Sequence, residues 1–139
     1  MSESSIRGSC LCGKVSFEVG PPFLKMVHCH CSRCRKSTGT GHGTNLITDP
    51  AGFKWLTGEE LISRYDVPDA KSYGKWFCRH CGCPVPRVTR NGALMVVPAG
   101  SLDEVPPLTP TDHIFWDSRA PWGCPSGDLP THPEYPDSW

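Results

Sequence analysis

The sequence lacks any long hydrophobic run, and it lacks an excess of charge of either sign. Nowhere do about 18 apolar residues follow one another, as a membrane-spanning helix requires. The first ten residues, MSESSIRGSC, contain no apolar stretch of the kind found in a signal peptide. Lysine plus arginine and aspartate plus glutamate both number 14, so charge gives no reason to expect a nucleic-acid or anionic-membrane partner. We therefore expect a cytoplasmic protein that acts on a small ligand.

Helical periodicity is also scarce, and short strand patterns separated by proline and glycine dominate the chain. Residues 14–19, KVSFEV, alternate polar and apolar side chains as a half-buried strand does. Only residues 32–38 favour a helix, with Ser32 as its N-cap and Gly39 as the residue that ends it. Further strands are expected at 23–31, 45–48, 53–56, 61–67, 75–78, 84–89 and 94–97. The pattern predicts a mainly β fold with short helical turns.

The turn sequences and the length predict how these strands are organised. Asn91-Gly92 lies between two apolar runs and predicts a hairpin with a two-residue type I′ turn, because both residues tolerate positive φ. A chain of 139 residues suits one modest core. We expect residues 1–139 to form a single domain, with its core over about 8–122 and a tail over 123–139 whose end is loosely held.

Cysteine, in contrast, is abundant. The chain has nine cysteines, and the odd number, the close C-x-C and C-x-x-C spacings and the absent signal peptide favour metal thiolates over disulfides. They stand at positions 10, 12, 29, 31, 34, 78, 81, 83 and 124.

Two of the cysteine pairs predict one closed metal site. Cys10 and Cys12 are two residues apart, so on an extended strand their side chains share a face. Cys78 and Cys81 enclose a tight turn, and Gly82 can take the left-handed conformation that such a turn needs, as Gly13 can after Cys12. Four thiolates favour tetrahedral zinc, and a complete ligand set favours a structural role.

Three further cysteines lie in HCHCSRC, residues 28–34. Cys29, Cys31 and Cys34 supply three ligands and leave a fourth position open, as in reactive zinc sites that bind water or a substrate thiolate. We therefore expect this group to be the catalytic one.

The neighbouring histidines and the two remaining cysteines leave alternatives open. On an extended strand His28 and His30 face away from the cysteines, so we expect them to be core residues or to support the ligands rather than to bind metal. The three-cysteine group would instead be a second closed site if Cys83 or Cys124 were its fourth ligand. Cys83 also fits a spare thiol beside the first site, and Cys124 fits a free cysteine.

Five segments in this order carry a resemblance to a known family: GSCLCGKVSFEV, CHCSRCRKSTGT, KWFCRHCGCPV, AGSLDE and HIFWDSRAPW, which together span residues 8–122. They resemble the glutathione-dependent formaldehyde-activating enzyme family. The resemblance implies a zinc-bearing β-tent fold and a structural zinc bound by Cys10, Cys12, Cys78 and Cys81.

The resemblance also implies a second, reactive zinc at Cys29, Cys31 and Cys34. There glutathione would condense with formaldehyde to S-hydroxymethylglutathione, a carbon-sulfur lyase type of chemistry. Family members often carry a small residue other than cysteine at the position of Cys83, so this chain departs from the family pattern there.

The expected chemistry suits these residues. Coordination to zinc lowers the pKa of a thiol, so a bound glutathione sulfur would be ionised and could attack an aldehyde carbon. Three thiolates leave the site anionic, which favours delivery of the thiol over activation of the carbonyl. A helix start near Ser32 could help to hold a ligand carboxylate. As further ligand-binding residues we expect Lys36, Ser37, Thr38, Gly39, Arg119 and Trp122.

Two other classes of protein compete with this hypothesis. A non-catalytic zinc-stabilised binding module, similar to the exchange-factor-like chaperones with a β-tent, needs the four-cysteine site but not the three-cysteine group. A reductase similar to methionine sulfoxide reductases would use Cys83 or Cys124 as nucleophile, which requires a depressed thiol pKa. The sequence does not indicate an oligomeric state.

Overall fold

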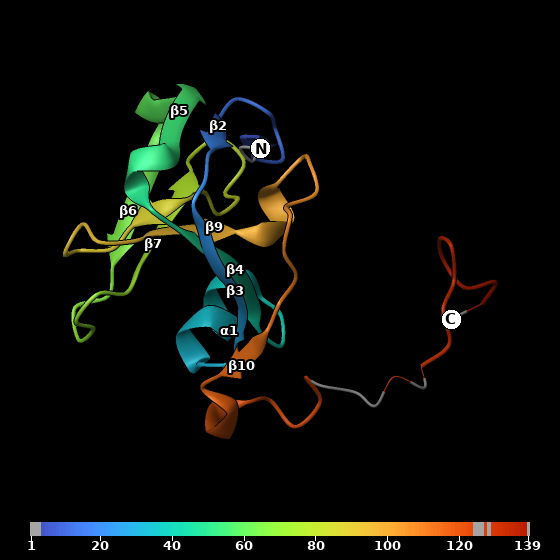
Figure 1. The fold of residues 1–139 in the computed structure, drawn as a ribbon. Coiled ribbons are helices and arrows are strands. Elements are labelled where there is room, and N and C mark those ends of the chain that lie inside the picture. Colours follow the sequence, from blue (N-terminus) through green and yellow to red (C-terminus); the bar gives the residue numbers. More distant parts are fainter. Residues whose placement is uncertain (1–3, 124–126, 128, 139) are drawn as a thin grey trace.

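The computed structural model describes residues 4–123, 127 and 129–138. Strands dominate the described chain, and α1 (Ser32–Thr38) is the one α-helix within it (Figure 1). The strands are β1 (Ile6–Ser9), β2 (Ser16–Val19), β3 (Phe23–Cys29), β4 (Gly43–Thr48), β5 (Phe53–Thr57), β6 (Ile62–Asp66), β7 (Gly74–Cys78), β8 (Arg87–Val88), β9 (Met95–Pro98) and β10 (Asp112–Ile114). The predicted mainly β fold class is confirmed.

The strands form three sheets, with the orders β1-β2-β5, β10-β3-β4-β9-β8 and β6-β7. Neighbouring strands are antiparallel except for β10, which runs parallel to β3 and pairs Ile114 with Cys29. Side chains from the first two sheets form the main core, in which Phe17 stacks on Phe53 at a centroid distance of 5.7 Å. The buried members of this core are Ile6, Phe17, Val19, Met26, Leu46, Met95 and Val97.

A second cluster of buried side chains joins the start of the chain to the end of β7. It contains Cys10, Val15, Cys78 and Val85. Two of its four members are cysteines from distant parts of the sequence, so this small core is built around the first predicted metal site.

The predicted helix is confirmed, but its N-cap is not the predicted one. Gly39 has φ 72°, the left-handed conformation expected at a helix C-terminus, and its N–H donates to the Arg35 carbonyl. The N-cap is Cys31 rather than Ser32, because the sulfur of Cys31 accepts from the Cys34 N–H at 3.3 Å. A cysteine of the three-cysteine group therefore also begins the helix.

The hairpin between β8 and β9 is confirmed, whereas its predicted type I′ turn is wrong. The Thr89 N–H donates to the Leu94 carbonyl and the Gly92 N–H to the Thr89 carbonyl, so the loop is longer than two residues. Of Asn91 and Gly92, only Gly92 takes a positive φ, of 74°. Asn91 instead accepts hydrogen bonds on its side-chain oxygen, from the Thr89 hydroxyl and the Ala93 N–H.

The structure contains two strands that the sequence did not predict, β1 and β10. Within the described residues no helix is long and apolar enough to cross a membrane. Residues 129–138 lie away from the sheets (Figure 1), and Cys124 lies outside the described residues.

Candidate metal centres and the adjoining cavity

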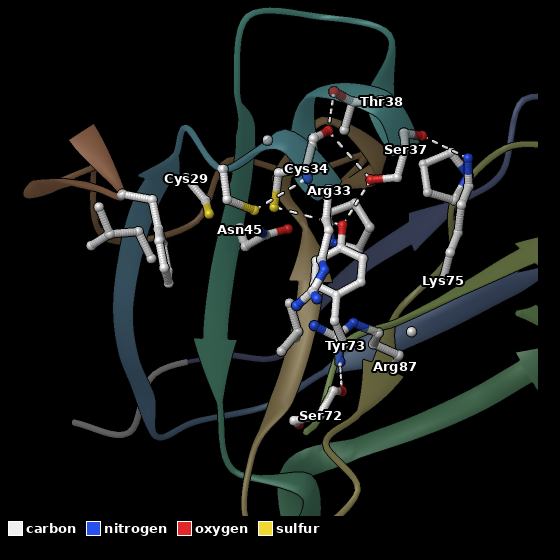
Figure 2. A pocket seen from close by; sticks show the side chains of 18 of the residues that line it. Cys29, Arg33, Cys34, Ser37, Thr38, Asn45, Ser72, Tyr73, Lys75 and Arg87 are labelled. Atoms are coloured by element: carbon white, nitrogen blue, oxygen red, sulfur yellow. Dashed lines mark hydrogen bonds between the residues drawn. The ribbon is translucent and has the colours of Figure 1, made fainter. Parts of the chain in front are cut away.

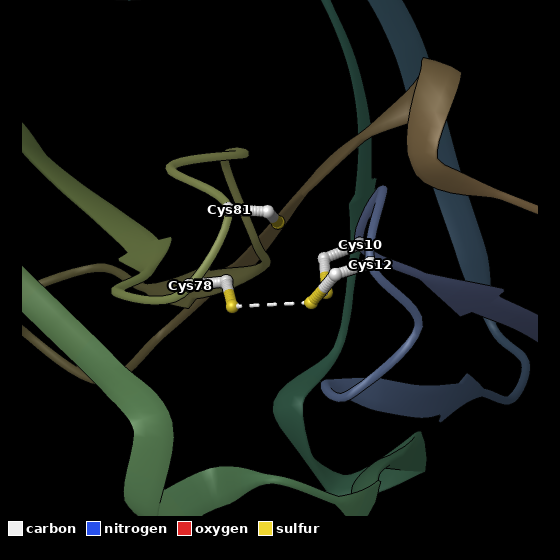
Figure 3. A group of neighbouring side chains, drawn as sticks. All are labelled: Cys10, Cys12, Cys78 and Cys81. Carbon is white, nitrogen blue, oxygen red and sulfur yellow. Dashed lines mark hydrogen bonds between the residues drawn. The ribbon is translucent and has the colours of Figure 1, made fainter.

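The structure brings together two cysteines that follow β1 and two at and after the end of β7 (Figure 3). The sulfur atoms of Cys10, Cys12, Cys78 and Cys81 all lie within 4.8 Å of one another. The Cys10 and Cys12 sulfurs are 3.5 Å apart, and those of Cys12 and Cys78 are 3.9 Å apart. Four sulfurs at 2.3 Å from a tetrahedral ion are about 3.8 Å apart, so the group fits a metal ion with little rearrangement.

Both halves of this four-cysteine cluster are tight turns, which corrects the expected strand at Cys10 to Cys12. Strand β1 ends at Ser9, and the Gly13 N–H donates to the Cys10 carbonyl at 3.0 Å. The second turn is one residue wider, and it is closed by a hydrogen bond from the Gly82 N–H to the Cys78 carbonyl at 2.7 Å. The φ angles of the two glycines are 78° and 77°, a region that glycine enters without a steric penalty. Each turn directs two sulfurs towards one point.

One thiol of this cluster is acidic even though its surroundings are partly buried. Burial raises the pKa of Cys81, but hydrogen bonds from the N–H groups of Cys12 and Cys83 and from the thiols of Cys10 and Cys78 outweigh it and lower the pKa to about 6. The cluster therefore offers a thiolate to a metal ion at neutral pH.

Cys83 lies beside the cluster without joining it. A hydrogen bond from the Leu11 N–H lowers the pKa of Cys83, but burial and the thiols of Cys81 and Cys10 outweigh it, so the net shift is upward. A raised pKa disfavours Cys83 as the nucleophile of a reductase. Among the described residues Cys83 belongs to neither metal-ligand group.

The second group, which we call the three-cysteine cluster, consists of Cys29, Cys31 and Cys34. Their sulfurs also lie within 4.8 Å of one another, and they come from the end of β3, the turn after it and the first turn of α1. A hydrogen bond from Cys34 lowers the pKa of Cys29 to about 6, and the same bond together with burial raises the pKa of Cys34. Among the described residues this cluster has no fourth sulfur.

The three-cysteine cluster opens into a cavity of about 720 Å³ (Figure 2). Although the chain has 14 cationic and 14 acidic residues, the cavity is lined by four cationic side chains and by one carboxylate, that of Asp69. The cationic residues are Arg33, Lys71, Lys75 and Arg87. The cavity therefore combines soft metal ligands with an excess of positive charge.

A hydroxyl pair connects this lining to the cysteines. The Tyr73 hydroxyl donates to the Cys34 sulfur at 3.6 Å and lies 2.8 Å from the Ser37 hydroxyl. Burial raises the pKa of Tyr73, which keeps its phenol protonated. Lys75 donates to the Ser37 carbonyl at 2.6 Å, and the Arg87 guanidinium lies 5.0 Å from the Tyr73 ring centroid. The wall beside the cysteines is thus held by several contacts.

The predicted ligand-binding residues are only partly found at this cavity. Ser37 and Thr38 line it. Its described lining does not include Lys36, Gly39, Arg119 or Trp122. Five lining residues are not indicated by any sequence pattern: Arg33, Lys71, Tyr73, Lys75 and Arg87. Scattered polar residues of this kind usually indicate a solvated surface, and only the tertiary fold brings α1, the segment up to Lys75 and β8 to one cavity.

The histidines beside the cysteines occupy the other face of the sheet. His28 pairs with Thr44 across the ladder and its Nδ1 lies 2.7 Å from the Thr44 hydroxyl, while His30 is fully buried. Burial lowers the pKa of both His28 and His30, and the imidazoles of His42 and His113 lower it further. Within the described chain neither histidine is part of a metal-ligand group.

Comparison with known proteins agrees with this arrangement. The model of the glutathione-dependent formaldehyde-activating enzyme family matches residues 5–118. A protein of Halomonas elongata named "Putative glutathione-dependent formaldehyde-activating enzyme" is 28% identical over 123 residues, which cover 84% of this chain and 78% of that protein. The crystal structure of a Rhodobacter sphaeroides protein is similar with a TM-score of 0.62 and 25% identity, over 78% of this chain and 99% of that one. The chain therefore belongs to the glutathione-dependent formaldehyde-activating enzyme family.

Proposed function

We propose that this single-domain, cytoplasmic protein binds zinc at both cysteine clusters and joins glutathione, or a related small thiol, to formaldehyde. The four-cysteine cluster would hold a structural ion, because it offers a complete tetrahedral ligand set. The three-cysteine cluster would hold a labile ion that leaves one position for the thiol. The observation that carries the proposal is the opening of this second cluster into a large, positively charged cavity.

Charge in the cavity supports glutathione as the substrate. Glutathione carries two carboxylates and one ammonium group, so it is a net anion at neutral pH. The cationic side chains of Arg33, Lys71, Lys75 and Arg87 favour such a ligand over a neutral or cationic thiol. In the proposed binding mode these four residues hold the charged ends of glutathione, a role that the sequence had suggested for Lys36, Arg119 and Trp122.

The reaction needs no reactant beyond the thiol and the aldehyde. Zinc, when bound, would keep the substrate thiol ionised at neutral pH. The sulfur forms a bond to the aldehyde carbon, and the carbonyl oxygen takes up a proton in place of the one that the thiol has lost. The hydroxyls of Tyr73 and Ser37, which line the cavity beside Cys34, would offer hydrogen bonds to the product hydroxyl.

The test is calorimetry of glutathione against the zinc-loaded wild type and the Cys31→Ser variant. Serine retains the N-cap of α1, because a hydroxyl accepts the Cys34 N–H as the sulfur does, so the variant loses a metal ligand without losing the helix start. We expect Cys31→Ser to fold and to lose glutathione binding. The control is Cys83→Ser, because the Cys83 thiol belongs to neither cluster in the described chain. This variant should bind glutathione as the wild type does.

Equal binding by the wild type and Cys31→Ser, or no binding by the zinc-loaded wild type, would refute the proposal. The latter result would favour the alternative of a non-catalytic zinc-stabilised binding module. That module requires neither the three-cysteine cluster nor the cavity beside it, which is why we prefer an enzyme.

A further inference from the structure

Phe115 adopts a backbone conformation that is unfavourable for its residue type. Its φ and ψ are 54° and 42°, and it is the one non-glycine residue with positive φ in the described part of the chain. Left-handed backbone costs free energy in a residue with a bulky side chain, and such outliers gather at functional sites. Its side chain is not held in the core, since the residue is 63% exposed. The packing of its own side chain therefore gives no reason for the strain.

The segment that carries Phe115, residues 112–119, is firmly attached to β3. We call it the strap. At its start Lys25 forms an ion pair with Asp112. The Nε2 of His30 then lies 2.8 Å from the Nδ1 of His113, and the His30 N–H donates to the Ile114 carbonyl at 2.9 Å. These bonds fix the strap directly against the turn between the first two ligands of the three-cysteine cluster.

The strap is also fixed after Phe115. The Trp116 ring packs edge-on against His30 with a centroid distance of 5.0 Å. The Arg119 guanidinium lies over the same Trp116 ring, 4.4 Å from the ring centroid, and donates to the Trp116 carbonyl at 2.9 Å. Because the chain is held on both sides, Phe115 keeps the strained conformation and its position.

That position is at the cavity of the three-cysteine cluster. Ile114, Phe115 and Ser118 of the strap line it, whereas its cationic side chains all come from other segments. The lining thus combines the aliphatic and aromatic side chains of Ile114 and Phe115 with the cationic residues. The strained backbone of Phe115 thus places an aromatic residue at the lining of this cavity.

We propose that Phe115 determines specificity for the length of the thiol substrate, by covering the peptide portion of a ligand whose sulfur lies at the three-cysteine cluster. This inference rests on the proposed function. A thiol that extends from the cysteines towards the cationic residues has a middle portion of methylene and amide groups, which an aromatic face can cover. A thiol of only two carbons ends before that portion and gains nothing from the ring.

The test combines stability with binding in two variants that remove the ring, Phe115→Asn and Phe115→Gly. Both residues tolerate left-handed backbone, so we expect the urea midpoint to stay the same or to rise. The dissociation constant of glutathione should increase about tenfold, the usual size of a lost apolar pocket contact, while that of 2-mercaptoethanol stays unchanged. Phe115→Tyr keeps the ring and should restore glutathione binding.

Each other outcome has a distinct meaning. If the wild type binds glutathione and Phe115→Asn binds it equally well, the inference about Phe115 fails and the proposed function stands. If the zinc-loaded wild type binds neither thiol, the proposed function fails and this inference fails with it. A lower urea midpoint in both variants would assign the ring a structural role. A dimeric wild type that becomes monomeric in both variants by sedimentation would assign it to a subunit interface, and either result overturns the inference.

Discussion

Replacement of Cys78 by serine removes one ligand from the four-cysteine cluster at its most buried position. Cys78 is fully buried, and its sulfur is 3.9 Å from that of Cys12 in the other half of the cluster. A metal ion bound by this cluster would link the N-terminal turn to the end of β7. A structural zinc supplies about 10–16 kcal/mol of folding free energy in small zinc domains. A domain of this size is stable by only about 5–15 kcal/mol in total, so we expect Cys78→Ser to be unfolded or insoluble.

The matched control is Cys83→Ser, five residues away in the same loop. Its thiol belongs to neither cluster in the described chain, so this variant should keep its zinc, and its free energy of unfolding should stay within about 1 kcal/mol of the wild-type value. Zinc per chain measured by mass spectrometry, together with circular dichroism and urea unfolding, compares the two variants directly. A soluble Cys78→Ser protein that unfolds cooperatively and keeps the zinc content of the wild type would refute this assignment of ligands.

Further predictions address the other parts of the structure. A chelator should remove zinc from the three-cysteine cluster first, and the emptied thiols should then be able to form a disulfide; two ions that resist chelation equally would contradict an open site. Gly82→Ala should destabilise the fold by about 1–2 kcal/mol in urea unfolding, because φ is 77° there, although the added methyl group meets no atom within 4 Å. Phe17→Ala should cost about 3–5 kcal/mol in the same assay, since Phe17 is fully buried. Lys71→Glu should weaken glutathione binding several-fold in low salt, and this difference should shrink as calorimetry is repeated at higher ionic strength.

The parts of the site that the sequence predicted correctly are those that depend on neighbouring residues. Spacing alone identifies Cys78 and Cys81 as one half of a ligand set, because the turn between them is short. The same reasoning was wrong about Cys10 and Cys12, which lie in a second turn rather than on a strand. Both conformations bring two sulfurs to one side, so the grouping of the cysteines did not depend on the error.

The parts that the sequence did not predict depend on long-range pairing. Strand β10 is three residues long and is held by parallel pairing with β3, a partner more than 80 residues earlier. Nothing in its own sequence distinguishes it from the surrounding loop. Its position nevertheless decides which residues line the cavity. Pairing with β3 places Ile114 opposite Cys29, and Phe115 comes directly after Ile114.

Alternation along β3 explains why cysteines and histidines that adjoin in sequence are separated in space. Cys29 lines the cavity, whereas His28 pairs with Thr44 and approaches His42 and His113 on the opposite side of the sheet. Successive side chains of a strand point to opposite faces, so the cavity face can keep soft sulfur ligands while the other face anchors the strap through imidazoles. The HCHC segment, at the end of β3 and in the turn that follows, therefore contributes to two surfaces. Its cysteines line the cavity, and its histidines contact the strap.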